Sequence, residues 1–331
     1  MQTVSRVIND GPNVRPAMRQ RVLSSIEKLG YVPSTAAQRL SGSRSYLILA
    51  LNDRDRTIAD WRERQGADWV DQMLLGGMLK GAEYGYRLMF ELVDTHDSQV
   101  ERELRSTIAS LQPDGVILTP PHSENARITA LLEESGIEFA RIGSLQPGPG
   151  IALAMDDEHA AGLATDHLAR LGHRRIGFIA GSSEYSLSAR RTAGWKAAMD
   201  ARGLPTANLL AEGDFSYESG LVEARALLDL DAPPTAIIAS SDRMTLACLD
   251  VAAERNLAVP GDLSLLSFDN TPVVHFTKPT LTAIDQPVAA IAATAMELII
   301  RSLRDDVLPP QPVIIEASLV ERQSTAPPRD V

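Results

Sequence analysis

The stretch YLILAL at residues 46–51 opens the pattern that decides the fold class. It is a short apolar run followed by a segment with helical spacing, and this alternation continues along the chain. The next apolar runs are RLMFELV (87–93) and GVILTP (115–120), and the amphipathic segments cover 70–86, 100–111 and 126–135. Such alternation is typical of a parallel sheet covered by helices.

The same alternation restarts after a Gly/Pro-rich break, QPGPG, at 146–150. Further strands are predicted in RRIGFIAG (174–181), TAIIAS (235–240), DLSLLSF (262–268), LTAID (281–285) and PVIIEASLV (312–320), with helices over 159–171, 189–202, 219–228, 243–254 and 287–303. The pattern therefore predicts an α/β protein with two doubly wound parallel-sheet lobes. We expect lobe 1 at about 46–144 and 277–308, lobe 2 at about 145–276 and 309–325, and a tail at 326–331.

Residues 1–45 differ from the rest in both pattern and charge. They show helical spacing without strands: one predicted helix ends near 9–12, a second runs from Pro16 to Gly30, and a third covers 34–40. This segment holds seven Arg/Lys against two Asp/Glu, whereas residues 46–331 hold 25 against 41. A basic helical arm on an acidic body indicates a polyanion-binding unit joined to a domain that repels nucleic acid.

The composition excludes several other classes of protein. A lone cysteine, Cys248, makes no intrachain disulfide, which fits a reducing compartment, and the polar start MQTVSRVIND is unlike a secretory signal. The most apolar helical stretch, 291–300, is too short to span a bilayer. We therefore expect a cytoplasmic protein without membrane insertion.

Enzyme chemistry finds no support in the motifs. The six histidines (96, 122, 159, 167, 173 and 275) have no paired-metal spacing, and the chain lacks GxSxG, GxxxxGK[ST] and GxGxxG. His167 and His173 are expected to be helix-end or core residues. We predict no catalytic residue, no metal and no cofactor.

Several separated phrases resemble one family across nearly the whole chain. TVSRVIND and RQRVLSSIEKLGYVPSTAAQRL near the start are followed in order by LGHRRIGFIAG, ARRTAGWKAAM, PTAIIASSDRM, VPGDLSLLSFDN, PTLTAIDQP and LVERQST. These phrases are similar to those of the lactose/galactose repressor (LacI/GalR) family of bacterial transcription regulators. The resemblance implies a helix-turn-helix headpiece (1–33), a hinge helix and linker (34–45), and a two-lobed, dimerising effector domain (46–325) like a periplasmic sugar-binding protein.

One departure from the family concerns the start of the chain. Family members have about sixteen more residues upstream, which supply the first headpiece helix, so the apolar face of Val4, Val7 and Ile8 is expected to lack a packing partner. A misassigned start, a truncation and a true variant with impaired DNA binding all remain open.

The predicted DNA-binding residues lie in the headpiece and hinge. Gln2 and Arg6 share a helical face and are long enough to reach adenine and guanine edges in the major groove. Thr3, Ser5, Asn9, Asn13, Arg15 and Tyr31 complete the headpiece set, mostly as phosphate contacts. In the hinge, Ala36, Ala37 and Leu40 resemble the residues that pair across the dimer and wedge into the minor groove. Residue types alone favour a solvated polar face, and the family resemblance reverses that preference.

The predicted effector residues follow strands or match family positions. They are Trp69, Thr119, Arg191, Phe215, Ser241 and Asp269. An arginine guanidinium can donate hydrogen bonds to two hydroxyl groups at once, and a carboxylate can accept hydrogen bonds from two vicinal hydroxyl groups. Aromatic faces can stack on a pyranose ring. The alternatives are core packing for Trp69 and Phe215, a surface ion pair for Arg191 and a strand-end cap for Asp269.

Residues 52–67, NDRDRTIADWRERQGA, interrupt the expected turn between strand and helix. The insertion is interpreted as a neutralised surface loop in preference to a lid over the cleft.

These observations predict a homodimeric repressor of carbohydrate-utilisation genes that binds double-stranded operator DNA and a small sugar-like effector. Effector binding is expected to weaken DNA binding, or to strengthen it if the effector is a corepressor. The rival hypothesis is a sugar-binding protein of a transport or sensing system with no role on DNA.

Overall fold

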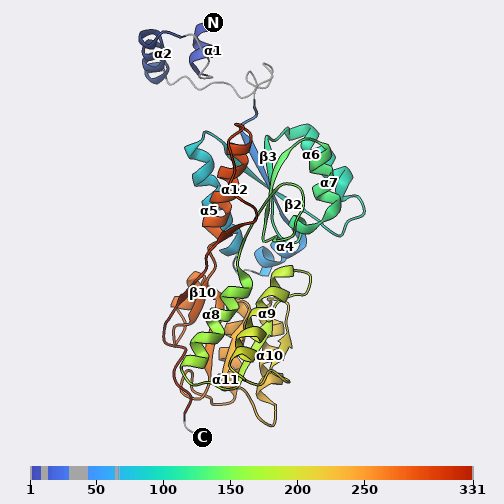
Figure 1. Ribbon diagram of the computed structural model, residues 1–331, viewed down its shortest axis with the longest axis vertical. Coiled ribbons are helices and arrows are strands. Elements are labelled where there is room, and N and C mark those ends of the chain that lie inside the picture. The colour runs from blue at the N-terminus through green and yellow to red at the C-terminus, as the bar shows by residue number, and fades with distance from the viewer. Residues whose placement is uncertain (1, 9–13, 30–43, 64–65, 67, 330–331) are drawn as a thin grey trace. The chain divides into compact units, whose positions relative to one another are not determined.

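The computed structural model describes residues 2–8, 14–29, 44–63, 66 and 68–329 (Figure 1). The chain divides into two units, residues 1–45 and 46–331.

The first unit contains the two helices that the spacing predicts. Helix α1 covers Gln2–Ile8 and helix α2 covers Pro16–Leu29, with proline at the first helical position, where its missing N–H costs no hydrogen bond. Val7 is buried where the helices contact, whereas Val4 is 40% exposed. The predicted helix at 34–40 lies outside the described residues.

Lobe 1 of the second unit is built on a six-stranded parallel sheet in the order β11-β5-β4-β3-β1-β2. Its strands are β1 (Leu47–Asp53), β2 (Arg87–Val93), β3 (Gly115–Leu118), β4 (Glu138–Ile142), β5 (Ile151–Met155) and β11 (Val313–Ile315). Because helices cover both faces, the central strands β1 and β3 are apolar almost throughout rather than alternating.

Helices α5 (Asp68–Glu83) and α12 (Val288–Ser302) cover one face of this sheet, and α6 (Val100–Leu111) and α7 (Ala126–Glu134) cover the other (Figure 1). Gly76 allows α5 to approach α12 closely, since a Cβ there would lie 1.9 Å from the carbonyl oxygen of Ala289. The lobe also contains α4 (Arg54–Glu63) and the 3₁₀ turn η1 (His122–Glu124).

Lobe 2 has a second six-stranded sheet in the order β12-β10-β9-β8-β6-β7, parallel except for the β10–β12 pair. Its strands are β6 (Ile176–Ala180), β7 (Leu210–Glu212), β8 (Ala236–Ala239), β9 (Ser264–Asp269), β10 (Thr282–Asp285) and β12 (Ser318–Val320). Its helices are α8 (Asp157–Arg170) and α9 (Ser186–Ala201) on one face, α10 (Tyr217–Leu228) and α11 (Asp242–Glu254) on the other, and the 3₁₀ turn η2 (Pro272–His275).

The chain crosses between lobes at different points from those expected. Strands β5 and β11 belong to the sheet of lobe 1, and β10 belongs to that of lobe 2. The Gly/Pro-rich break at 146–150 is a loop between two adjacent strands of one sheet, β4 and β5, rather than a lobe boundary. The segments of lobe 1 are therefore 46–156 and 287–316, and those of lobe 2 are 157–286 and 317–329.

Three strands and one helix were not predicted. Strand β4 carries Arg141 within its apolar run, β5 reads IALAM directly after the break, and β7 has only three residues. The helix is α4, inside the insertion. Within the described residues, no helix is long and apolar enough to cross a membrane.

Candidate functional site

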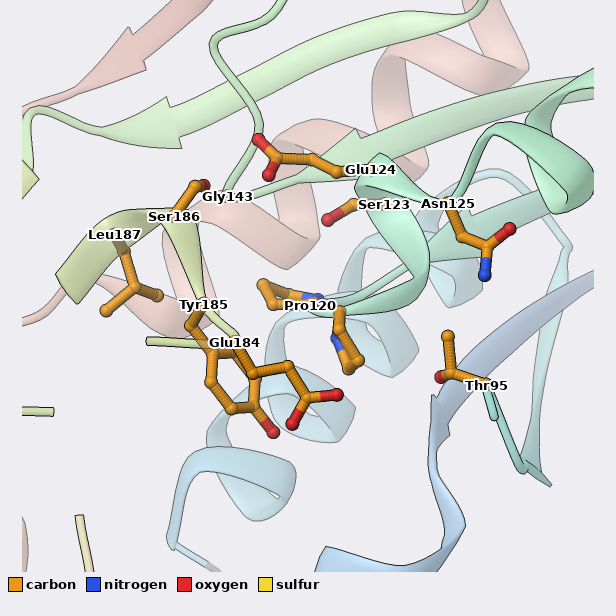
Figure 2. Close-up of a pocket in the computed structure, with 11 residues that line it drawn as sticks. Thr95, Pro120, Ser123, Glu124, Asn125, Gly143, Glu184, Tyr185, Ser186 and Leu187 are labelled. Carbon is orange, nitrogen blue, oxygen red and sulfur yellow. The ribbon is translucent and has the colours of Figure 1, made fainter. Parts of the chain in front are cut away.

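Two cavities lie between the lobes and share the side chains of Thr95, Glu184 and Tyr185. One has a volume of about 190 Å³, with Pro120 and Ser123 on one side and Tyr185 and Leu187 on the other (Figure 2). The other has a volume of about 270 Å³, and its lining includes His96 and the charged residues Asp53, Asp55, Arg56, Asp94, Glu184 and Asp214. Parallel sheets present ligand-binding groups at the carboxyl ends of their strands, and both cavities lie there.

The insertion at 52–67 is not the surface loop that was expected. It forms helix α4, whose N-terminus is held by Asp53, since the carboxylate Oδ1 accepts the amide of Arg56 at 2.9 Å. The helix reaches lobe 2, where Nη1 of Arg243 lies 2.6 Å from Oδ1 of Asp60. The alternating charges that suggested a neutralised loop therefore include an ion pair between the lobes, in the described part of the segment.

Phe215 is buried next to Tyr185, which lines both cavities, and adopts a left-handed backbone conformation with φ 72°. Its ring packs edge-on against Tyr185, with 5.8 Å between ring centres and an angle of 82°. Gly181 makes room for this ring, because a Cβ at that position would lie 1.9 Å from a ring carbon. A left-handed non-glycine residue at a ligand cleft is the kind of strain that functional sites retain.

Arg191 is not a surface residue, and the surface-ion-pair alternative is wrong. Its side chain is 2% exposed, and Nε donates to Oδ1 of Asp157 at 2.9 Å while Nη1 donates to the carbonyl of Ser240 at 2.9 Å. The guanidinium also lies over the ring of Phe268, 4.4 Å from its centre. In this conformation Arg191 connects the start of α8 to the carboxyl ends of strands β8 and β9.

Asp269 ends β9 with φ 93° and lies beside Asp242. Burial, and then the charge of Asp269, raise the pKa of Asp242 to about 7, although Ser267 and Thr271 donate hydrogen bonds to its carboxylate. Burial also raises the pKa of Asp269, an effect that the nearby Arg191 opposes. A half-buried carboxyl at the end of a strand, next to a buried one, is suited to a ligand that donates hydrogen bonds.

The other predicted effector residues are placed differently. Ser241 caps α11, accepting the amide of Met244 and donating to the carbonyl of Phe215, each at 3.2 Å. Thr119 is buried at the end of β3 and donates to the carbonyl of Leu51 at 2.8 Å. Trp69 packs against the core of lobe 1, which favours its packing alternative. The structure thus brings Arg191, Phe215, Ser241 and Asp269 together in lobe 2, with Thr119 on the lobe 1 side.

Sequence reasoning did not predict the residues that form contacts between the two lobes. His96 lies 2.7 Å from Glu184 between Nε2 and Oε1, and Nη2 of Arg190 donates to the carbonyl of Gly143 at 2.7 Å. Asp53 ends β1 and Asp94 follows β2, so the rule about strand ends could have found both. No pattern in the sequence pointed to Arg56 or Tyr185.

The predicted DNA-binding residues are only partly described. Gln2, Thr3, Ser5 and Arg6 lie on α1, where the side chains of Thr3 and Arg6 are exposed, and Arg15 is exposed directly before α2. Asn9, Asn13, Tyr31, Ala36, Ala37 and Leu40 lie outside the described residues. In its own unit, the exposed Arg6 is available for contact with a polyanion.

The chain matches two family models. Residues 1–34 match "Bacterial regulatory proteins, lacI family", and residues 165–325 match "Periplasmic binding protein-like domain". The sequence is 30% identical to Catabolite control protein A of Priestia megaterium over 98% of this chain and 95% of that protein. It is 30% identical to the transcriptional repressor CytR of Escherichia coli K12 over 98% of this chain and 92% of that protein.

Solved structures of transcriptional regulators also resemble this chain. The complex of the transcriptional regulator CelR with cellobiose has a TM-score of 0.76 at 27% identity, covering 98% of this chain and 95% of that one. The lac repressor dimer bound to operator shares the fold, with a TM-score of 0.80 at 23% identity and the same coverage. The headpiece helices, the two parallel-sheet lobes and these matches together show that the chain belongs to the LacI family of bacterial transcriptional regulators.

Proposed function

We propose that this regulator is a dimeric repressor whose affinity for operator DNA is controlled by a small, neutral, sugar-like effector in the cleft between its lobes. The observation that carries the proposal is the pairing of a basic helical unit with a cleft that presents carboxylates beside an aromatic ring. Sugars combine hydroxyl donors with an apolar face, and the cleft offers a complementary group for each.

The effector contacts that we propose are Phe215, Asp269, Ser241 and Thr119. The ring of Phe215 supplies a stacking surface, and the carboxyl of Asp269 accepts hydrogen bonds from hydroxyl groups. Arg191 is proposed as a positioning residue, because its Nε binds Asp157 and its Nη1 binds the carbonyl of Ser240.

On the DNA side, Gln2 and Arg6 are the proposed base-reading residues, because they share one helical face of α1. Thr3, Ser5 and Arg15 are proposed phosphate contacts, together with Asn9, Asn13 and Tyr31. The hinge residues Ala37 and Leu40 are proposed to enter the minor groove. A repressor that acts on bacterial genes works in the cytoplasm.

A second copy of the chain is the proposed dimer partner. On α5 of lobe 1, the spacing of Leu75, Met78 and Leu79 places three apolar side chains on one helical face, and they are 47%, 56% and 61% exposed. In lobe 2, Val222 and Phe276 are 60% and 82% exposed. Large apolar side chains exposed in both lobes are suited to an interface that runs along the whole core.

Binding to DNA from the region upstream of its own gene tests this function. Fluorescence anisotropy would be measured with that DNA and with a scrambled duplex, before and after glucose, galactose, maltose or cellobiose is added. Preference for the upstream DNA, and a change on adding one of these sugars, would support the proposal. No preference for the upstream DNA, together with sugar binding detected by calorimetry, would support the transport or sensing alternative.

A further inference from the structure

Helix α4 belongs to lobe 1 by its own packing. Nη2 of Arg54 lies 2.6 Å from Oδ2 of Asp94, and the ring of Trp61 lies 6.2 Å from that of Phe90, both partners being in or directly after β2. These contacts hold the helix on the lobe from which it emerges.

The same helix also contacts lobe 2. Arg243 at the start of α11 pairs with Asp60 and donates to the carbonyl of Gly66 at 2.8 Å, so this one side chain holds the end of the insertion. Asp60 and Arg243 have side chains that are 21% and 24% exposed, which limits the screening of their charges by solvent. Helix α4 therefore contacts both lobes, and Figure 1 shows it at the end of lobe 1 that lies next to lobe 2.

Arg56 is the residue of α4 that enters the cleft. Its guanidinium carbon lies 5.2 Å from the ring centre of Phe215 and 5.5 Å from that of Tyr185. The two rings stand nearly perpendicular, so they form an aromatic corner, and Asp53, Glu184 and Asp214 line the same cavity. A planar cation held between aromatic rings and carboxylates is well matched in both shape and charge.

We propose that Arg56 is an intramolecular occupant of the effector site, and that an effector must displace its guanidinium to stack on Phe215. This inference rests on the proposed function and deepens it, because it concerns the regulation of the same cleft. The cavity volumes of about 190 and 270 Å³ support it, since ligand pockets usually enclose about 300–1,000 Å³. The space that a ligand would need is partly filled by the chain itself.

An arginine in the effector site raises the effector concentration that is needed for binding. When only a fraction of the molecules has an open site, the apparent dissociation constant of the ligand rises by the inverse of that fraction. The salt bridge between Asp60 and Arg243 adds to this effect, because it holds α4 against lobe 2.

The test asks whether removing Arg56 opens a site for a small guanidinium ion. Ethylguanidinium would be titrated into the full chain, with binding followed by ligand-detected saturation-transfer NMR against an equal concentration of NaCl. We expect Arg56→Ala to bind ethylguanidinium at least tenfold more tightly than the wild type does, because its aromatic corner is vacant. The matched control is Arg62→Ala, since Arg62 is exposed on the same helix and its loss changes the net charge equally.

A second variant checks that the new site is the aromatic corner. Adding Phe215→Leu to Arg56→Ala removes a ring face while keeping an apolar side chain, and it is expected to abolish the gain. Arg56→Gln serves if the alanine variant melts at a lower temperature. Equal binding of ethylguanidinium to the wild type, Arg56→Ala and Arg62→Ala, or binding to none of them, would overturn the proposal.

The readout needs no DNA, so the two proposals can fail separately. If Arg56→Ala binds ethylguanidinium more tightly but the chain shows no operator preference, the proposal about Arg56 holds and the proposed repressor function is rejected. If the chain prefers its operator but Arg56→Ala shows no gain in ethylguanidinium binding, the repressor function holds and the proposal about Arg56 is rejected.

Discussion

The guanidinium carbon of Arg56 lies 5.2 Å from the ring centre of Phe215, although the first residue belongs to lobe 1 and the second to lobe 2. On our proposal, this contact places an arginine on the ring face that would otherwise be open to the effector. Because Arg56 belongs to the insertion at 52–67, the contact links this insertion to the aromatic pair of Phe215 and Tyr185.

Arg56→Ala is expected to make the repressor more sensitive to its effector. Losing a cation–π contact of about 1–2 kcal/mol corresponds to a decrease of about tenfold in the sugar concentration that half-releases the DNA. Titrating the wild type, Arg56→Ala and Arg62→Ala on operator DNA with the releasing sugar measures this value. An unchanged or higher half-release concentration in Arg56→Ala would argue against displacement.

Arg191→Ala is expected to lower the free energy of unfolding by about 1.5–3 kcal/mol, because the buried Asp157 carboxylate loses its shorter ion pair and keeps only the contact with Arg190 at 3.3 Å. Arg202→Ala is the matched control, since Arg202 also pairs with an aspartate of α8, Asp166, but at an exposed position. That substitution is expected to cost less than about 1 kcal/mol. Urea unfolding of both variants gives the comparison, and equal losses would contradict the positioning role of Arg191.

The raised pKa of Asp242 has a consequence for stability. Between the usual carboxyl pKa of 3.8 and the folded value of about 7, the folded state binds a proton that the unfolded state releases. The stability gained from this proton is complete below pH 4 and is lost as the pH rises towards 7.

Asp242→Asn should remove this pH dependence. The free energy of unfolding of the wild type, minus that of the variant, is expected to fall by about 1–4 kcal/mol from pH 4 to pH 7.5. Urea melts at several pH values measure the difference. A difference that is constant with pH, or that grows as the pH rises, would show that Asp242 titrates normally.

Arg6 and Arg15 are expected to act differently on DNA. Arg6→Ala should weaken binding to the operator by about 1–3 kcal/mol and relax the preference at one base pair, whereas Arg15→Ala should weaken operator and scrambled DNA alike. The salt slope of binding should decrease by about one for Arg15→Ala. Anisotropy titrations at several salt concentrations separate the two effects. A uniform loss of DNA affinity in Arg6→Ala and a loss of base preference in Arg15→Ala would contradict these roles.

Periodicity and family phrases predicted most of the fold, since buried strands such as β1 and helices such as α6 carry strong apolar patterns. Strand β5 was missed because a Gly/Pro-rich loop reads the same between adjacent strands as between domains. The lobe assignment of β11 depends on β5, a pairing partner distant in sequence, which local patterns do not encode. Strand β10 pairs with the preceding strand β9, so the expected return to lobe 1 was placed one strand too early.

The site was predicted less completely, for physical reasons that differ between residues. Asp269 ends a strand with a strong apolar pattern and Phe215 matches an aromatic position of the family, so both could be singled out from the sequence. Arg191 also matched a family position, but its burial against Asp157 depends on a neighbouring helix. Arg56 lies in an insertion, where neither the family nor periodicity gives guidance, and its role depends on a contact across the cleft.

The most direct test of regulated DNA binding is the affinity of the full chain for DNA upstream of its own gene, compared with a scrambled duplex, with and without the panel of sugars. A specific repressor should prefer the upstream DNA by at least about 10³-fold, and one sugar should change that affinity by about 5- to 150-fold. Equal affinity for the two duplexes, unchanged by any sugar, would contradict the account.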